Sequence, residues 1–164
     1  MNWGINKVTD VCKVSSKVLE AELSIKEGKY KEAIPLLTDA IQIEDNLNYN
    51  EPPDWFFSVR HTLGYVLLKT KACAEAEKVY REDLAVWPKN GFALNGLVES
   101  LTAQGKASEA EEIRKQFAEA WQYADMALQA SIIDPEKRKD LTLSIDEKSP
   151  DGLVYLASAI CMTR

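Results

Sequence analysis

One histidine and three cysteines are the side chains of this sequence best suited to nucleophilic or metal chemistry: His61, Cys12, Cys73 and Cys161. His61 and Cys73 could form a Cys–His pair, but no Asn or Asp that would orient the histidine stands at a recognisable spacing. One histidine with scattered cysteines is also poor material for a zinc site, which needs three or four ligands. The sequence therefore predicts no catalytic, metal or cofactor site, and it indicates a protein that is not an enzyme.

The cysteines also bear on the compartment. They are odd in number and widely spaced, and no CxxC occurs. Reduced, mostly buried thiols are therefore expected rather than a disulfide framework. The first residues contain no apolar stretch long enough for a signal peptide, and no window approaches the roughly 20 apolar residues that span a membrane. We expect a cytoplasmic protein.

Charge disfavours two classes of partner. The 164 residues include 20 Lys and Arg against 26 Asp and Glu, a net charge of −6. Nucleic acids and anionic membranes both favour clusters of Lys and Arg, so neither is an expected partner. Acidic pairs such as Glu75 and Glu77 have the spacing of a solvated helix face, and glycine-rich phosphate motifs are absent.

The sequence repeats itself. "AEAEKVYREDL" aligns with "ASEAEEIRKQF", which places Ala76 and Ala110 34 residues apart. Upstream, "KEAIPLL" places Ala33 in the same role, 43 residues before Ala76. The difference predicts a nine-residue insert in the first interval, at about residues 45–54.

Each repeat has the pattern of two helices joined by a tight turn. Apolar residues recur at helical spacing from Val59 to Lys69, and Pro88 stops the helix that follows at about 74–86. The last repeat turns at Gly105-Lys106, with Ser108 as the expected N-cap of its second helix. Gly28-Lys29 makes the corresponding turn in the first repeat. One helical hairpin cannot bury its apolar face alone, so stacking of neighbours is expected.

These residues resemble the tetratricopeptide repeat family. Leu63-Gly64, Ala76, Tyr80 and Pro88 match its Leu-Gly, small, aromatic and proline positions in the middle repeat. The likeness covers about residues 14–120, and "EPPDWFF" with the repeat after it resembles the last repeats of long, poorly characterised members of the family. It implies an all-α fold, a right-handed α-solenoid of about three helical hairpins with flanking terminal helices.

The expected organisation is a repeat domain at 1–130 followed by a tail at 131–164. The repeats fall at about 14–44, 57–90 and 91–121. The second helix of the last repeat is expected to continue to about Ala130. A final helix from about Pro150 to Met162 is expected to cap the array, because a terminal repeat needs a polar cover; a tail that stays free or pairs with another copy is the alternative.

The resemblance also places candidate partner-binding residues, because the first helix of each repeat lines the concave face. The candidates there are His61, Tyr65, Lys69, Phe92, Asn95 and Glu99. Some family members grip the acidic C-terminus of chaperones with a Lys-Asn-Asn-Lys-Arg clamp. The matching positions here are Val18, Glu22, Thr62, Phe92 and Gly96, and none carries the required residue. Clamp-type chaperone binding is therefore not expected.

The insert adds one more candidate, Trp55. Pro52 and Pro53 exclude a helix through this point, and Asp54 could cap the next helix, which would place Trp55, Phe56 and Phe57 in its first turn. Trp55 could pack beneath the loop and close the seam between repeats, or it could contact a partner. The first interpretation predicts a loss of stability when the ring is removed, and the second predicts a loss of binding.

The leading functional interpretation is a non-enzymatic protein–protein interaction module, a scaffold or adaptor that holds a peptide or a helix on its concave face. The alternative is an accessory or C-terminal part of a larger enzyme, with catalysis in an upstream or separate domain. Self-association through exposed repeat ends is a third possibility. The sequence does not name the partner.

Overall fold

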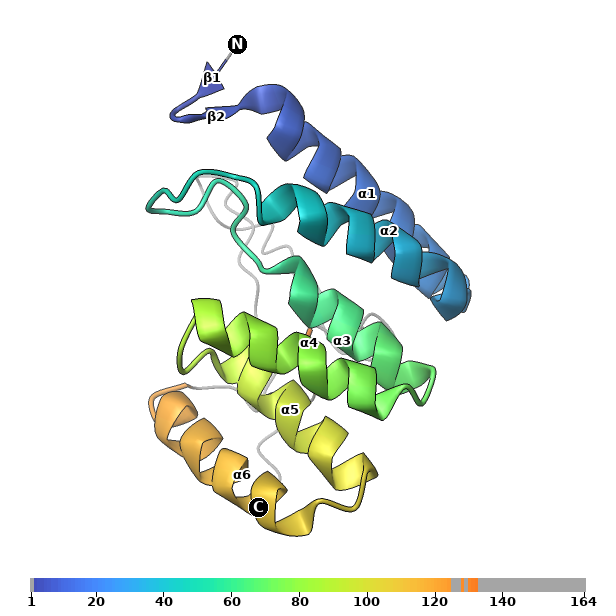
Figure 1. Cartoon of the computed structure of the whole chain (residues 1–164), viewed down its shortest axis with the longest axis vertical. Coiled ribbons are helices and arrows are strands. Elements are labelled where there is room, and N and C mark those ends of the chain that lie inside the picture. Colours follow the sequence, from blue (N-terminus) through green and yellow to red (C-terminus); the bar gives the residue numbers. More distant parts are fainter. Residues whose placement is uncertain (1, 125–127, 129, 133–164) are drawn as a thin grey trace, which may run out of the picture. The chain divides into compact units, whose positions relative to one another are not determined.

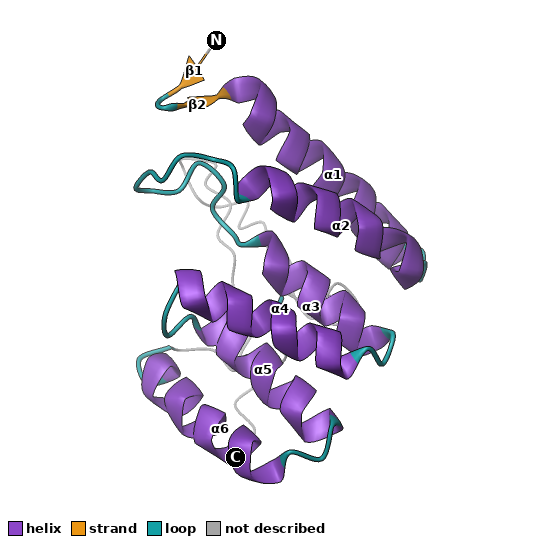
Figure 2. Ribbon diagram, viewed as in Figure 1, coloured by secondary structure: helices purple, strands orange, loops and turns teal. Residues whose placement is uncertain are grey.

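In a computed structural model, residues 2–124, 128 and 130–132 are described, and they form six α-helices after a short β-hairpin (Figure 1; Figure 2). The elements are β1 Asn2–Trp3, β2 Asn6–Lys7, α1 Val8–Lys26, α2 Tyr30–Glu44, α3 Val59–Lys69, α4 Cys73–Val86, α5 Gly91–Ala103 and α6 Ala107–Trp121. The predicted all-α class is confirmed for these residues, whereas the antiparallel hairpin was not predicted. The expected tail helix falls in the unit Ile133–Arg164, outside the described residues.

Each helix packs against the next one along the chain, and α3 also contacts α5 directly (Figure 1). The expected hairpins α1–α2, α3–α4 and α5–α6 are therefore all present as contacting pairs. Within the described part of the chain, no helix combines the length and the apolar character that a membrane crossing requires.

The three turns within these hairpins are built in the same way. Each contains one residue with positive φ, Gly28 at 75°, Lys71 at 64° and Gly105 at 75°. The amide of the next residue donates back to the carbonyl five residues earlier, at 2.8, 2.9 and 3.0 Å respectively, as a Schellman turn requires. The turns are 43 and 34 residues apart, the same intervals that separate the repeated alanines.

Lys71 occupies the turn position that glycine holds in the other two hairpins. A left-handed conformation costs a residue with a Cβ about 1–2 kcal/mol, whereas glycine adopts it freely. We therefore expect Lys71→Gly to raise the free energy of unfolding by about 1 kcal/mol in denaturant titrations. Lys115→Gly, in the exposed part of α6, should lower it by about the same amount; a loss of stability in Lys71→Gly would contradict this account.

Small residues mark the places where helices cross closely. Ala33, Ala76 and Ala110, one in each hairpin, are 0%, 0% and 2% exposed. Leu37 and Tyr80, each four residues after the alanine of its own hairpin, are both fully buried. The Tyr80 ring fills the space between α3 and α5.

The loop between the first two hairpins differs from the prediction. The third helix begins at Val59, not after Asp54, so Trp55, Phe56 and Phe57 lie in the loop. Asp54 does not cap the helix, because its carboxylate accepts hydrogen bonds from the side-chain amides of Asn6 at 2.7 Å and Asn50 at 3.2 Å. The carboxylate of Glu44 takes that place and accepts from the amide of Val59 at 3.2 Å.

The N-terminal hairpin is tied to this loop through Asn6. The side chain of Asn6 is buried, donates to the carbonyl of Asn48 at 3.0 Å and accepts from its amide at 2.7 Å. These two bonds reproduce the pairing of a strand with a strand, although only one partner is backbone. The nine-residue insert is therefore held by the N-terminus of the chain.

Two expectations about the last hairpin are also wrong. Ser108 is not the N-cap of α6, which begins at Ala107 because the Schellman turn places Lys106 at the cap position. The helix ends at Trp121 rather than near Ala130. A turn closes it, in which the amide of Ala124 donates to the carbonyl of Trp121 at 3.0 Å. Further along the chain, Ala130 and Ser131 are buried.

Candidate functional site

A cavity of about 280 Å³ opens where the loop before α3 meets the start of α5. We call it the aromatic pocket. Its lining consists of Glu44, Pro53, Trp55, Phe56, Phe57, Ser58, His61, Trp87, Asn90 and Phe92. Five of these residues are Trp or Phe, and Glu44 is the one formally charged residue among them. The cavity lies just below the volume range of pockets for drug-sized ligands, so it has room for a single side chain.

The rings that line the pocket form a connected cluster. Phe57 meets Phe92 edge to face with centroids 5.1 Å apart, and it meets His61 in the same manner at 4.7 Å. Trp121 of α6 meets Phe92 edge to face at 5.5 Å. Such pairs fix the orientation of their rings, so this wall of the pocket is held from α3, α5 and α6 together.

Glu44, the last residue of α2, adds an acidic side chain to the lining of this aromatic pocket. One carboxylate oxygen accepts from Val59, and the other has no hydrogen-bond partner among the described residues. Arg60 is the nearby cation, but its guanidinium forms a bidentate ion pair with Asp45. Its two terminal nitrogens each donate to one carboxylate oxygen of Asp45 at 2.7 Å. Burial raises the pKa of Glu44 to about 7, against the smaller opposing effects of the Val59 amide and Arg60. Among the described residues, Arg60 thus offsets only part of the effect of burial on Glu44.

Because the pKa of Glu44 is raised, the free energy of unfolding should depend on pH. Between the ordinary pKa of 4.5 and about 7, the folded protein keeps a proton that the unfolded chain has lost. The contribution of Glu44 to the free energy of unfolding therefore falls as the pH rises through this window, by up to about 3 kcal/mol. Glu44→Gln should remove that dependence. In urea titrations, the variant should therefore be more stable than the wild type at pH 8 but not at pH 4.

Glu32→Gln is the matched control, because Glu32 lies on the exposed side of the same helix. It removes the same charge without removing a buried carboxylate. Stability curves for the Glu44 variant and the wild type that run parallel from pH 4 to pH 8 would show that Glu44 does not titrate as described.

His61 has a partner that the sequence did not suggest. Its Nε2 lies 3.0 Å from the Oδ2 of Asp83 on α4, and the two side chains are 2% and 0% exposed. His61 Nδ1 and Asp83 Oδ1 are buried without a hydrogen-bond partner among the described residues. His61 thus borders the pocket while its polar atoms are directed to Asp83 and to the interior, which is the geometry of an internal tie between α3 and α4.

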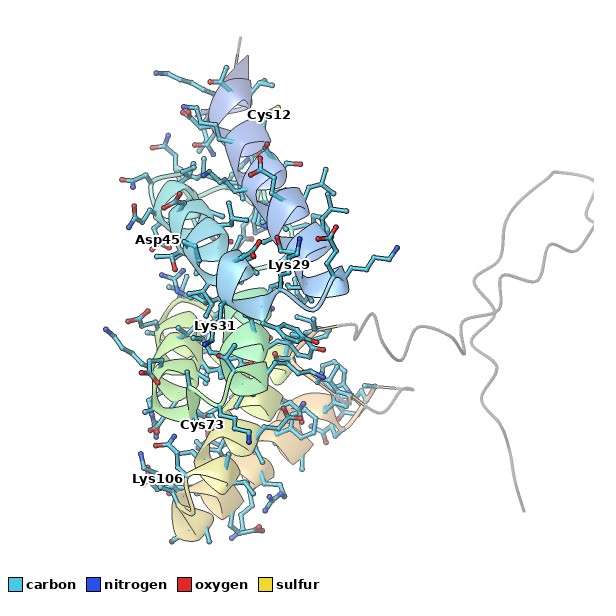
Figure 3. All side chains as sticks on the ribbon, turned by 90° about the vertical axis from the view of Figure 1, so that its right-hand side faces the viewer. Cys12, Lys29, Lys31, Asp45, Cys73 and Lys106 are labelled. Atoms are coloured by element: carbon cyan, nitrogen blue, oxygen red, sulfur yellow. The ribbon has the colours of Figure 1, made fainter. Side chains whose placement is uncertain are left out.

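The Cys–His pair weighed above is not formed. Cys73 begins α4, and ten residues of helix, about 15 Å at 1.5 Å per residue, separate it from Asp83, where His61 is bound. Cys12 lies on α1, well away from Cys73 (Figure 3). Within residues 2–124, 128 and 130–132, no group of three or more His, Cys, Asp or Glu side chains could hold a metal ion.

The structure divides the seven candidate residues into two groups. Trp55, His61 and Phe92 meet at the aromatic pocket. The others follow α3 and α5 away from it, and Lys69 Nζ lies 5.1 Å from the centroid of the Tyr65 ring. Tyr65 is only 4% exposed, so with His61 it belongs to the interior rather than to an open surface. Lys69 and Glu99 are exposed, and Asn95 is half-buried.

The face made by α3 and α5 already receives a piece of the chain. Tyr80 passes between these helices, and its hydroxyl lies 2.6 Å from the hydroxyl of Ser131. Ser131 in turn donates to the backbone carbonyl of His61 at 3.1 Å. Ala130 and Ser131 are 5% and 1% exposed, and Ile132 packs against the core. A short segment that follows α6 therefore lies against α3.

Sequence reasoning missed Glu44, Trp87 and Asp83 at this site. Asp83 carried a usable signal, because it follows Ala76 by seven residues and so shares the buried face of α4. An acid on a buried face needs a partner, and His61 is the only histidine.

No family model matches the chain, and no curated protein matches it.

Proposed function

We propose that the protein is a non-enzymatic protein–protein interaction module built from three tetratricopeptide-like hairpins, and that it binds a peptide or a helix on the face of α3 and α5. Three kinds of repetition support the repeat architecture: the Schellman turns, the buried alanines and the spacing that they share. On this proposal the hairpins stack as a right-handed solenoid, with the first helix of each repeat toward the concave side.

The observation that carries the binding role is the segment Ala130–Ile132. It shows that the surface of α3, next to the ring of Tyr80, accepts a short stretch of polypeptide with both side-chain burial and hydrogen bonds. A partner segment would follow the same face further along, past Lys69 of α3 and Asn95 and Glu99 of α5. Asn95 Nδ2 is buried there with no hydrogen-bond partner among the described residues.

Capture from a lysate of the native host tests this proposal. Wild-type protein is compared with a charge-reversed variant, Lys69→Glu with Glu99→Lys, in quantitative mass spectrometry. The control reverses two exposed charges on the other helices of these hairpins, Lys78→Glu on α4 with Glu112→Lys on α6. A partner retained by wild type and control but lost from the first variant is expected. Equal capture by all three, with unchanged melts, would contradict the proposed face.

The same capture distinguishes the alternative, an accessory part of a larger enzyme. A captured protein that is itself an enzyme, with turnover that changes when the chain is added, would favour this alternative. A partner-independent turnover that is abolished by His61→Ala or Cys73→Ser would overturn the non-enzymatic proposal altogether.

A further inference from the structure

We propose that the aromatic pocket takes a single basic side chain, a lysine or an arginine, carried by the partner polypeptide. This inference deepens the proposed function, because it names the chemistry by which the partner is anchored. It goes beyond the face of α3 and α5 described above, since the pocket opens at the start of these helices.

The first step is the match in charge. Among the described residues, Glu44 is the only formally charged one that lines the pocket, and one of its oxygens has no hydrogen-bond partner there. Arg60, the cation that could have neutralised it, is committed to Asp45. An ammonium or guanidinium group in the pocket would give this carboxylate a charge-assisted hydrogen bond. The net charge of −6 also favours a basic partner.

The second step is the match in shape. A basic side chain has an apolar stem below its charged head, and the stem packs well against rings. Trp55, Phe56 and Phe57 from the loop, with Trp87 and Phe92, supply those rings. A cation near ring faces is stabilised further by the ring quadrupole, and arginine also stacks on them. An uncharged apolar side chain would fill the same space but leave Glu44 without a partner.

The third step concerns access. Phe56 is 84% exposed although it lines the pocket, and Tyr49 in the same loop is 72% exposed. Phe56 contacts the Trp55 ring, with centroids 5.8 Å apart, but leaves most of its own surface open to solvent. Its position suits a ring that closes over a side chain entering from a partner.

Nuclear magnetic resonance of the full chain with labelled tryptophan indoles tests this. The probes are acetyl-Gly-Lys-Gly-amide and acetyl-Gly-Arg-Gly-amide, with the norleucine peptide as the uncharged match for lysine. The indole signals of Trp55 and Trp87 should shift with millimolar affinity for one or both basic peptides, and at least about tenfold more weakly for norleucine.

Three variants sharpen the test. Glu44→Gln should weaken binding of the basic peptides by about tenfold or more, whereas Glu32→Gln on the same helix should not. Phe56→Ala should weaken it by about two- to fivefold without a change in the melt, because the ring is exposed. Equal binding of norleucine and lysine, unchanged affinity in Glu44→Gln, or no shift at the highest soluble peptide concentration would overturn the inference. Any of these outcomes leaves the lysate capture to decide the proposed function separately.

Discussion

Replacement of His61 by leucine should lower the free energy of unfolding by about 3–5 kcal/mol, because it leaves the carboxylate of Asp83 buried and unpaired. The two side chains are 2% and 0% exposed, so water cannot take the place of the lost imidazole without opening the interface between α3 and α4. Asp83→Leu should be destabilising for the same reason, since it leaves His61 without an acceptor. Urea titrations that follow the helical circular dichroism signal measure both.

The double variant, His61→Leu with Asp83→Leu, provides the control. Well-packed apolar residues in place of a buried polar pair are often neutral or stabilising. We therefore expect the double variant to recover most of the loss, with a coupling energy of at least about 2 kcal/mol in the double-mutant cycle. Single variants close to wild type, or losses that simply add, would show that the hydrogen bond between His61 and Asp83 has no such role.

The helices themselves could be predicted closely from the sequence, because their signals are local. The body of α3 was predicted correctly, because apolar residues recur at helical spacing from Val59 to Lys69, whereas its start was expected just after Asp54. Gly28 and Gly105 marked two turns correctly, since glycine is the residue that adopts positive φ at the end of a helix. At Lys71 the same turn is made without glycine, so the position carried no such signal.

The caps could not be predicted, because residues distant in the sequence decide them. Asp54 is a good N-cap by type, yet Asn6, 48 residues away, takes its carboxylate. Glu44 then serves the amide of Val59, 15 residues further along. For the same reason the end of α6 was placed too late. Helix propensity favours its continuation, whereas Ala130 and Ser131 are buried further along the chain.

The candidate site was predicted in part. Trp55 was singled out because three large rings follow two prolines at the seam, and the pocket forms at that seam. His61 and Phe92 came from the family resemblance and lie at the same pocket. Glu44 was not singled out, because a glutamate at the end of an amphipathic helix has the pattern of a solvated residue. Only the packing of the loop over α2 gives it an unusual environment.

Substitution of Gly64 or Gly96 by alanine should destabilise the protein by about 1–3 kcal/mol or more, although alanine is ordinarily the better helix residue. A Cβ at Gly64 would lie 2.3 Å from Cζ of Tyr80, and one at Gly96 would lie 2.2 Å from the same atom. Tyr80 is fully buried between α3 and α5, so the ring has no space into which it can move. Truncation of the ring by Tyr80→Ala should cost about 3–5 kcal/mol, because it leaves a cavity between both helices.

The test is whether the effect of Gly64→Ala on stability changes sign when the Tyr80 ring is removed. In a Tyr80→Leu background, Cζ and the hydroxyl that crowd the two glycines are absent. Gly64→Ala should then be neutral, or should stabilise by up to about 1 kcal/mol through the lower entropy of the unfolded chain. Tyr80→Phe separates the hydroxyl from the ring, and it should cost only about 1 kcal/mol for the lost bond to Ser131. If Gly64→Ala is equally harmful in both backgrounds, close approach of the Tyr80 ring does not explain the glycine, and α3 and α5 are held apart by something other than this ring.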